Sequence, residues 1–101
     1  LEEKVCSLIN KALFKTKPTQ RHNAFKLLSN ALEEAEKISD SSRKTYYFNE
    51  IASAYAKLGN KETCLEVLDR TIKVAQAISY DGIKSTELSK LGSNYAKIGL
   101  A

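Results

Sequence analysis

The sequence holds few side chains that could carry out a reaction. Its one histidine, His22, has no second histidine with which to form a metal cluster or a proton relay. The two cysteines, Cys6 and Cys64, lie far apart on apolar helical stripes, so we expect small buried hydrophobic residues rather than reactive thiols or a disulfide. Neither a phosphate-binding G-x-x-x-x-G-K motif nor a G-x-S-x-G nucleophile motif is present. We therefore expect a protein that is not an enzyme and uses no cofactor or metal.

The composition favours a single helical domain over residues 1–101. With 43% hydrophobic and 28% charged residues but only 4 Gly and 1 Pro, the chain is too apolar for disorder and too poor in turn residues for a many-stranded sheet. No long apolar run and no signal peptide can be recognised. These features, with the unpaired cysteines, predict a cytoplasmic all-α protein with no membrane partner.

The net charge of +4 is unevenly distributed. Between Glu3 and Glu33 the chain has no acidic residue. The cations of this segment are Lys4, Lys11, Lys15, Lys17, Arg21 and Lys26. Such an excess favours an anionic partner only weakly, and a solvated helix face is the better explanation.

A stretch of the chain repeats itself after 40 residues. Aligning residues 31–60 with 71–100 without a gap gives nine identities in thirty pairs. The identical pairs are Ala35/Ala75, Ile38/Ile78, Ser39/Ser79, Lys44/Lys84, Ser53/Ser93, Tyr55/Tyr95, Ala56/Ala96, Lys57/Lys97 and Gly59/Gly99. A constant period of this length is typical of stacked helical hairpins, because each hairpin buries its apolar face only against its neighbour.

Within each repeat the apolar residues recur at steps of three and four, which predicts one stripe along a helix. The two equivalent stripes are Phe48, Ile51, Tyr55 and Leu58, and Leu88, Leu91, Tyr95 and Ile98. Gly59 and Gly99 follow where a helix end favours glycine, and Ser39 or Asp40, and later Asp81, can cap the next helix. The predicted helices span about 2–15, 19–38, 41–58, 61–79 and 82–98, the second and fourth being roughly five turns long.

The order Phe48-x2-Ile51-Ala52-x2-Tyr55-x3-Gly59, followed by Cys64-x3-Leu68-x2-Thr71, resembles the tetratricopeptide repeat (TPR). The order Leu88-x2-Leu91-Gly92-x2-Tyr95-x3-Gly99 resembles it again. The period is 40 rather than the usual value of about 34, and the proline that commonly ends the second helix is missing. In these respects the chain is similar to the longer-period variant found in scaffold and adaptor proteins and in bacterial signalling regulators.

The resemblance implies a right-handed α-solenoid of stacked antiparallel helical hairpins, with five helices and about two and a half repeats. We expect it to be a fragment of a longer array, because the sequence ends just after the glycine that precedes a second helix. The implied function is a protein–protein interaction module that binds a peptide or protein segment in its concave groove without catalysis. Tyr55 and Tyr95 would then be wedges between paired helices, and Gly59 and Gly99 would form turns.

In this family the first helices of successive hairpins line the concave groove. Carrying that geometry over places short polar side chains and lysines there. These residues are Tyr46, Asn49, Ser53, Lys57, Ser89, Ser93 and Lys97, and, through a looser N-terminal match, Lys4, Ser7, Lys11 and Lys15. Lysines with few acids suit a peptide that carries carboxylates. Lys57 and Lys97 would equally complement the dipoles at the C-terminal ends of their helices.

Two other functions stay open at this point. One is weak nucleic-acid binding through the segment from Lys4 to Lys26, although Phe14 and Phe25 fit a core better than a base-stacking surface. The other is a ligand- or peptide-sensing regulatory segment of a larger signalling or transcription regulator. Of these partners, nucleic acid is the least favoured.

The last predicted helix has an open outer side. Its outer face is expected to be polar, like that of a capping repeat. The residues expected there are Lys84, Glu87, Lys90 and Asn94. Because Ile83, Leu100 and the apolar stripe would still lie close to the open end, self-association through the C-terminal end is a further hypothesis.

Overall fold

The computed structural model describes residues 2–15, 17–78 and 81–99, and in these ranges it does not describe the side chains of Pro18, Asp81, Ile83 and residues 97–99. Over this part of the chain the fold is all-helical, as predicted, and has no strand. Its helices are α1 (Glu2–Leu13), α2 (Arg21–Glu36), α3 (Ser41–Lys57), α4 (Lys61–Ala75) and α5 (Asp81–Gly99), with a 3-10 helix, η1 (Pro18–Gln20), before α2. The cap predicted at Asp81, the turn predicted after Gly99 and the groove position predicted for Lys97 depend on parts that are not described.

α2 and α4 end earlier than the spacing predicts. They end at Glu36 and Ala75, so the expectation of five-turn helices is wrong. Ile38 and Ile78 are nevertheless buried after the helix ends. Their backbone N–H groups donate to the carbonyls of Ala35 and Ala75, three residues earlier. A tight turn therefore continues the apolar stripe, and residue spacing alone does not distinguish it from a helix.

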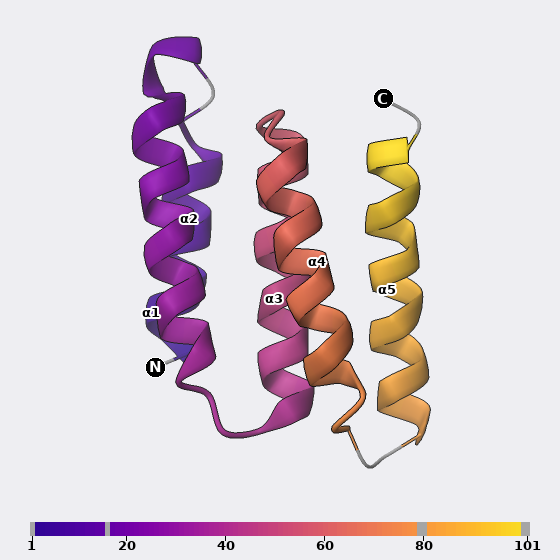
Figure 1. Cartoon of the computed structure of the whole chain (residues 1–101). Helices are drawn as coiled ribbons and strands as arrows, with labels where there is room; N and C mark the ends of the chain where they lie inside the picture. Colours follow the sequence, from indigo (N-terminus) through magenta and orange to yellow (C-terminus); the bar gives the residue numbers. More distant parts are fainter. Residues whose placement is uncertain (1, 16, 79–80, 100–101) are drawn as a thin grey trace.

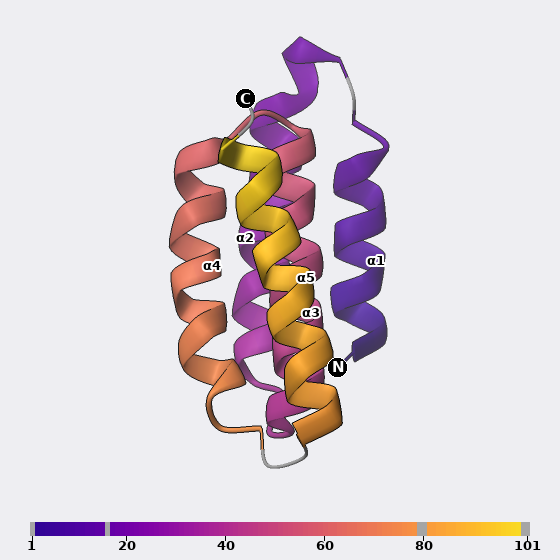
Figure 2. The same cartoon turned by 90° about the vertical axis from the view of Figure 1, so that its right-hand side faces the viewer.

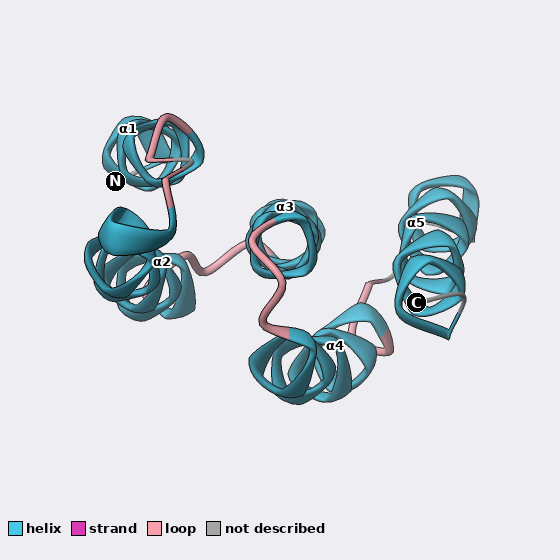
Figure 3. Cartoon of the chain, turned by 90° about the horizontal axis from the view of Figure 1, so that it is seen from above, coloured by secondary structure: helices cyan, strands magenta, loops and turns pink. Residues whose placement is uncertain are grey.

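The helices lie in two layers. α1, α3 and α5 form one layer and α2 and α4 the other (Figure 3). Successive helices run antiparallel, so the three helices of the first layer point in the same direction (Figure 1). α3 lies in the middle and contacts each of the other four helices, whereas α1 contacts only α2 and α3, and α5 only α3 and α4, within the described chain. α3 therefore positions the whole first layer.

α3 also supplies the centre of the core. Phe48 is 2% exposed and Ile51 is fully buried. Tyr55 lies between two hairpins, with its ring centroid 5.9 Å from that of Phe25 in α2 and its hydroxyl donating to the Phe25 carbonyl at 3.4 Å. The Tyr55 ring is thus buried against α2, a helix of the other hairpin, whereas the prediction places it between the two helices of one hairpin. Cys64 of α4 is buried as expected, and its desolvation raises the pKa of the thiol.

Two adjacent residues shape the turn between α3 and α4. Gly59 has a φ of 85°, the left-handed conformation that favours glycine after a helix. The Asn60 side chain accepts a hydrogen bond from the Thr63 N–H at 3.1 Å and caps α4. Asp40 caps α3 in the same way through the Ser42 N–H, which confirms one of the predicted caps.

We expect alanine at two glycines to change the free energy of unfolding in opposite directions. Gly59→Ala forces a Cβ into the left-handed conformation and should destabilise the protein by about 1–2 kcal/mol, although that Cβ would meet no atom within 4 Å. Gly92 lies inside α5 with equally open surroundings, so Gly92→Ala should stabilise by roughly 0.5–1 kcal/mol. Urea unfolding in dilute solution measures both values. Changes of the same sign would contradict this account of the turn.

Candidate functional site

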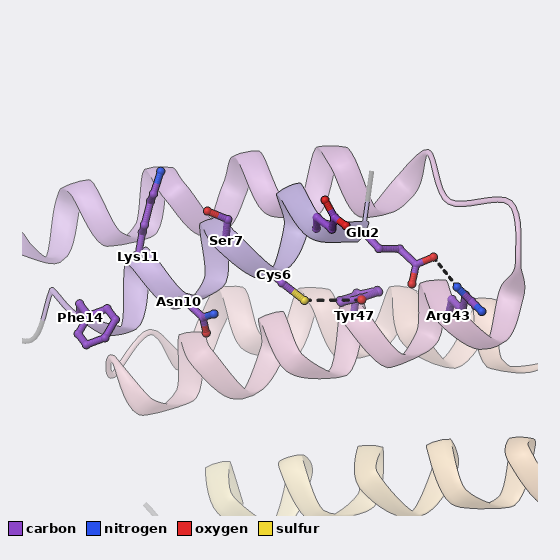
Figure 4. A pocket seen from close by; sticks show the side chains of 9 residues that line it. Glu2, Cys6, Ser7, Asn10, Lys11, Phe14, Arg43 and Tyr47 are labelled. Carbon is purple, nitrogen blue, oxygen red and sulfur yellow. Dashed lines mark hydrogen bonds and ion pairs between the residues drawn. The ribbon is translucent and has the colours of Figure 1, made fainter.

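Three neighbouring pockets lie along the face that α1, α3 and α5 share. Between α1 and α3 lies an open pocket of about 760 Å³ (Figure 4). A smaller pocket of about 130 Å³ shares Cys6, Asn10 and Tyr47 with it and extends to Glu50. A third pocket, of about 220 Å³, lies between α3 and α5 and also includes Glu50. We name this run of three pockets the inner groove.

The α1–α3 half of the inner groove has a paired charge at one end and an exposed ring at the other (Figure 4). Arg43 donates to the Glu2 carboxylate at 2.8 Å. The Cys6 thiol donates to the Tyr47 hydroxyl at 3.6 Å, and this contact together with burial raises the pKa of Tyr47. Phe14, at the far end, is 85% exposed. A phenol is protonated near neutral pH, so Tyr47 offers hydrogen bonding rather than charge.

A buried polar network joins α3 to α5. The Asn49 Nδ2 donates to the Glu87 carbonyl at 3.2 Å and to its carboxylate Oε2 at 3.1 Å. The Asn94 Nδ2 donates to the Asn49 carbonyl at 3.2 Å, and Lys90 Nζ lies 3.3 Å from the Glu87 Oε1. Asn49, Glu87 and Asn94 are 2%, 5% and 4% exposed, so water does not compete for these bonds. The Asn49 Oδ1 is buried without a partner among the described residues, which is a cost of this arrangement.

Tyr46 lies where the two halves of the groove meet. Its ring is edge-on to that of Tyr47, with the centroids 5.0 Å apart and the planes at 83°. Lys90 Nζ lies 4.7 Å from the Tyr46 ring centroid, so its charge contacts both this ring and Glu87. Tyr46 is still 40% exposed and therefore offers an aromatic surface in the middle of the groove.

The structure brings together some of the residues predicted for the groove. Those that line it are Ser7, Lys11, Tyr46, Asn49, Ser53 and Ser93. The Asn49 side chain is buried and bound to Glu87, so it holds α5 in place. Lys57 and Ser89 are exposed on α3 and α5 but do not line the three pockets.

Two predicted lysines lie apart from the groove lining. Lys4 contacts the other layer, with its ammonium 3.2 Å from the Glu34 carboxylate of α2, and this hydrogen bond lowers the pKa of Glu34. Lys15 follows the end of α1 and is half-buried. The N-terminal match that predicted both positions requires extra residues in the turn around Lys15 to Thr19. Its register is therefore less exact than that of the 40-residue repeat.

Two residues that the sequence predicts for the core lie on the surface. Cys6 is exposed, so the expectation of a buried thiol is wrong for Cys6 and right for Cys64. Phe14 is 85% exposed, and the expectation of a core position is wrong for it as well. Among the described helices, α1 packs against α2 and α3 only. It buries Val5 in this contact, and the neighbouring Cys6 lies outside it. Phe14 follows the end of α1, where these contacts stop.

The polar outer face predicted for α5 is also wrong. Glu87 and Asn94 are buried against α3, and Lys90 reaches the Tyr46 ring. The repeat could have indicated this arrangement. Glu87 occupies the position of Tyr47, a residue of α3 that contacts the preceding helix of the same layer.

The inner groove holds more acid than predicted, since Glu2, Glu3 and Glu50 line it. Sequence reasoning missed Glu50 although its spacing was informative. It follows Tyr46 by four residues and precedes Ser53 by three, so all three share one helix face. The groove prediction includes only lysines, Tyr46 and short polar residues, so it omits the Glu50 carboxylate.

Comparison with protein-family models, with curated proteins and with solved structures finds no match for the chain. Within the described residues, no helix combines the length and apolar character that crossing a membrane requires. In the same part of the chain, no three His, Cys, Asp or Glu side chains are grouped so that they could hold a metal ion. The geometry of the inner groove therefore carries the functional interpretation.

We expect Asn49 and Glu87 to be energetically coupled. Asn49→Ala removes a donor to a buried carboxylate and should destabilise the protein by about 1–3 kcal/mol. Glu50→Ala, at an exposed position one residue further along α3, is the matched control and should change stability by less than about 0.5 kcal/mol. A double-mutant cycle with Glu87→Ala, followed by urea unfolding, should give a coupling of roughly 0.5–3 kcal/mol. Additive effects would show that the network does not hold α5.

Proposed function

We propose that the chain is a TPR-like repeat domain, a right-handed α-solenoid of about two and a half stacked hairpins. The 40-residue repeat supports this proposal. So do the two layers of antiparallel helices and the central position of α3. Gly59 as a turn fits the role that the resemblance implies for it.

As to function, we propose a scaffold or adaptor module that binds a peptide or protein segment along the inner groove and has no catalytic activity of its own. The succession of three neighbouring pockets across α1, α3 and α5 is the observation that carries this proposal, because an extended segment laid across these helices can contact each pocket in turn. Along that path Ser7, Ser53 and Ser93 offer hydroxyl groups, and Tyr46 offers a ring.

Charge at one end of the groove favours an acidic segment. Lys11 and Lys57 lie in the last turns of α1 and α3, which point the same way, and neither forms an ion pair within the described residues. Of the acids along the groove, Glu2 is already paired, whereas Glu3 and Glu50 are exposed. A peptide whose carboxylates lie toward the C-terminal ends of α1 and α3 would meet the lysines and avoid Glu3.

We place the module in the cytoplasm. Cys6 and Cys64 are free, and Cys6 is exposed. An exposed thiol stays reduced in the cytoplasm and is prone to pairing in an oxidising compartment. This localisation agrees with an intracellular scaffold.

Short peptides selected from a random phage-displayed library against the whole chain test this function, and acidic sequences should be enriched. Fluorescence anisotropy of a selected peptide should show about tenfold weaker binding to Lys11→Glu, at a lysine that lines the groove, which corresponds to about 1.4 kcal/mol. Lys26→Glu makes the same charge change on α2, in the other layer, and should leave the affinity within about twofold. Equal weakening by both variants would show that only net charge matters.

An exposed aromatic ring favours a second candidate function, which is weak binding of single-stranded nucleic acid. Phe14 is 85% exposed, and Lys11, Lys15 and Lys17 lie within three residues of it. A base can stack on such a ring while nearby ammonium groups contact phosphates. The sequence analysis disfavours nucleic-acid binding partly because Phe14 is expected in the core. Since Phe14 is exposed, that objection no longer applies to this ring.

For this second candidate, Phe14→Ala should weaken binding of a single-stranded oligonucleotide by about 1–3 kcal/mol at low salt, and the wild-type affinity should fall steeply as salt rises. Leu65→Ala, at an exposed apolar residue of α4, is the control and should have no effect. Filter binding measures both. If the oligonucleotide does not bind at low salt, the candidate is excluded.

A further inference from the structure

The pocket between α3 and α5 is lined by polar side chains from both helices. Figure 2 shows α5 in front of α3, against which it packs. The pocket has a volume of about 220 Å³, and we name it the α3–α5 pocket. Its lining residues are Asn49, Glu50, Ser53, Lys90, Ser93 and Asn94. Asn49 and Asn94 are only 2% and 4% exposed, so buried amides form part of its wall.

One polar atom of this wall has no partner. The Asn49 Oδ1 is buried and accepts no hydrogen bond within the described residues. The Nδ2 of the same amide donates to the carbonyl and the carboxylate of Glu87, at 3.2 and 3.1 Å. Turning the amide over would place its oxygen against these two acceptors, so the oxygen is the atom that stays unpaired.

A buried acceptor without a donor costs free energy, and a ligand that supplies the donor removes that cost. Among the three pockets of the inner groove, Asn49 lines only the α3–α5 pocket. A donor from outside the chain would therefore reach the Asn49 Oδ1 through this pocket.

The charges beside the pocket leave one carboxylate unbalanced. The Lys90 ammonium lies 3.3 Å from the Glu87 carboxylate and 4.7 Å from the Tyr46 ring centroid, so its charge is already paired. Glu50 is exposed and forms no ion pair within the described residues. A buried acceptor next to such a carboxylate favours a cation that carries several N–H groups.

We propose that the α3–α5 pocket binds the charged end of a lysine or arginine side chain of the segment that occupies the inner groove. The ammonium or guanidinium group donates to the Asn49 Oδ1 and to the Glu50 carboxylate. The Ser53 and Ser93 hydroxyls can accept its remaining N–H groups. The inference rests on the proposed function and adds one basic residue to a segment whose acidic residues lie toward Lys11.

Other occupants fit these groups less well. A carboxylate would lie against Glu50 and would offer no proton to the Asn49 Oδ1. A water molecule or an uncharged amide can donate to that oxygen, but neither balances the charge of Glu50. A basic side chain satisfies both groups at once.

Nuclear magnetic resonance of the ¹³C,¹⁵N-labelled chain tests the pocket with defined probes. Nα-acetyl-lysine amide or Nα-acetyl-arginine amide should move the side-chain signals of Asn49 and the backbone signal of Glu50 as it is added. Nα-acetyl-norleucine amide has no charged group and should move neither. The proposal is overturned if both basic probes leave these signals in place, as expected of a pocket that holds only water. It is also overturned if the norleucine probe moves them equally.

Removal of the Glu50 charge tests the electrostatic part of the proposal. Glu50→Gln keeps the shape of the side chain and should weaken binding of the basic probe about threefold. Glu66→Gln is the matched control, because Glu66 is also exposed and lies on α4, in the other layer. It should leave the affinity unchanged. Equal weakening by both variants, or none by Glu50→Gln, would contradict the proposal.

Peptides selected against the whole chain separate this inference from the proposed function. Those that bind should contain a lysine or arginine, and replacing that residue with norleucine should weaken binding several-fold. If the affinity is unchanged, this inference fails and the proposed function stands, because the segment still binds. If no peptide binds although the basic probes move the Asn49 signals, the pocket for a basic group is supported and the peptide function fails.

Discussion

Burial of the apolar stripe of α3 is the interaction on which the other helices depend. α3 packs against all four of them, whereas α2 and α4 are joined by a surface ion pair between Arg70 and Glu36, 2.7 Å long. Phe48, Ile51 and Tyr55 are almost completely buried, and burying each side chain contributes about 1.5–3 kcal/mol. Neither hairpin could bury its own apolar face alone. The repeat is thus a physical requirement, since each unit provides the surface that its neighbour needs.

The two sides of α3 hold the first layer together by different means. Toward α4 the contact is apolar and includes the buried Cys64. Toward α5 it includes the buried carboxylate of Glu87, whose desolvation is offset by hydrogen bonds from Asn49 and an ion pair with Lys90. Glu87 and Lys90 of α5 are thus both used in this contact with α3. The orientation of α5 beside the inner groove therefore depends on its polar contacts with α3.

The sequence predicts most of the fold because the 40-residue repeat fixes the register of its helices. It predicts the place of Tyr55 on the buried stripe and the turn at Gly59 for that reason. It does not predict the exposure of Cys6, because the N-terminal match lies outside the ungapped repeat. Burial of Glu87 is missed since a carboxylate normally faces water, and only the partner Asn49 on another helix reverses that preference. Spacing defines a helix face, but the chemistry of that face depends on its neighbour.

Chemical-shift mapping of the ¹⁵N-labelled chain with an aspartate- and glutamate-rich peptide tests the central claim, that the inner groove binds an acidic segment, most directly. The account predicts that amide signals along the groove side of α1 and α3 move together as the peptide is added, including those of Lys11, Tyr46 and Ser53. Signals from the outward side of α2 and α4 should stay in place. Shifts confined to α2 and α4, around Lys26 and Asn60 for example, would contradict the account.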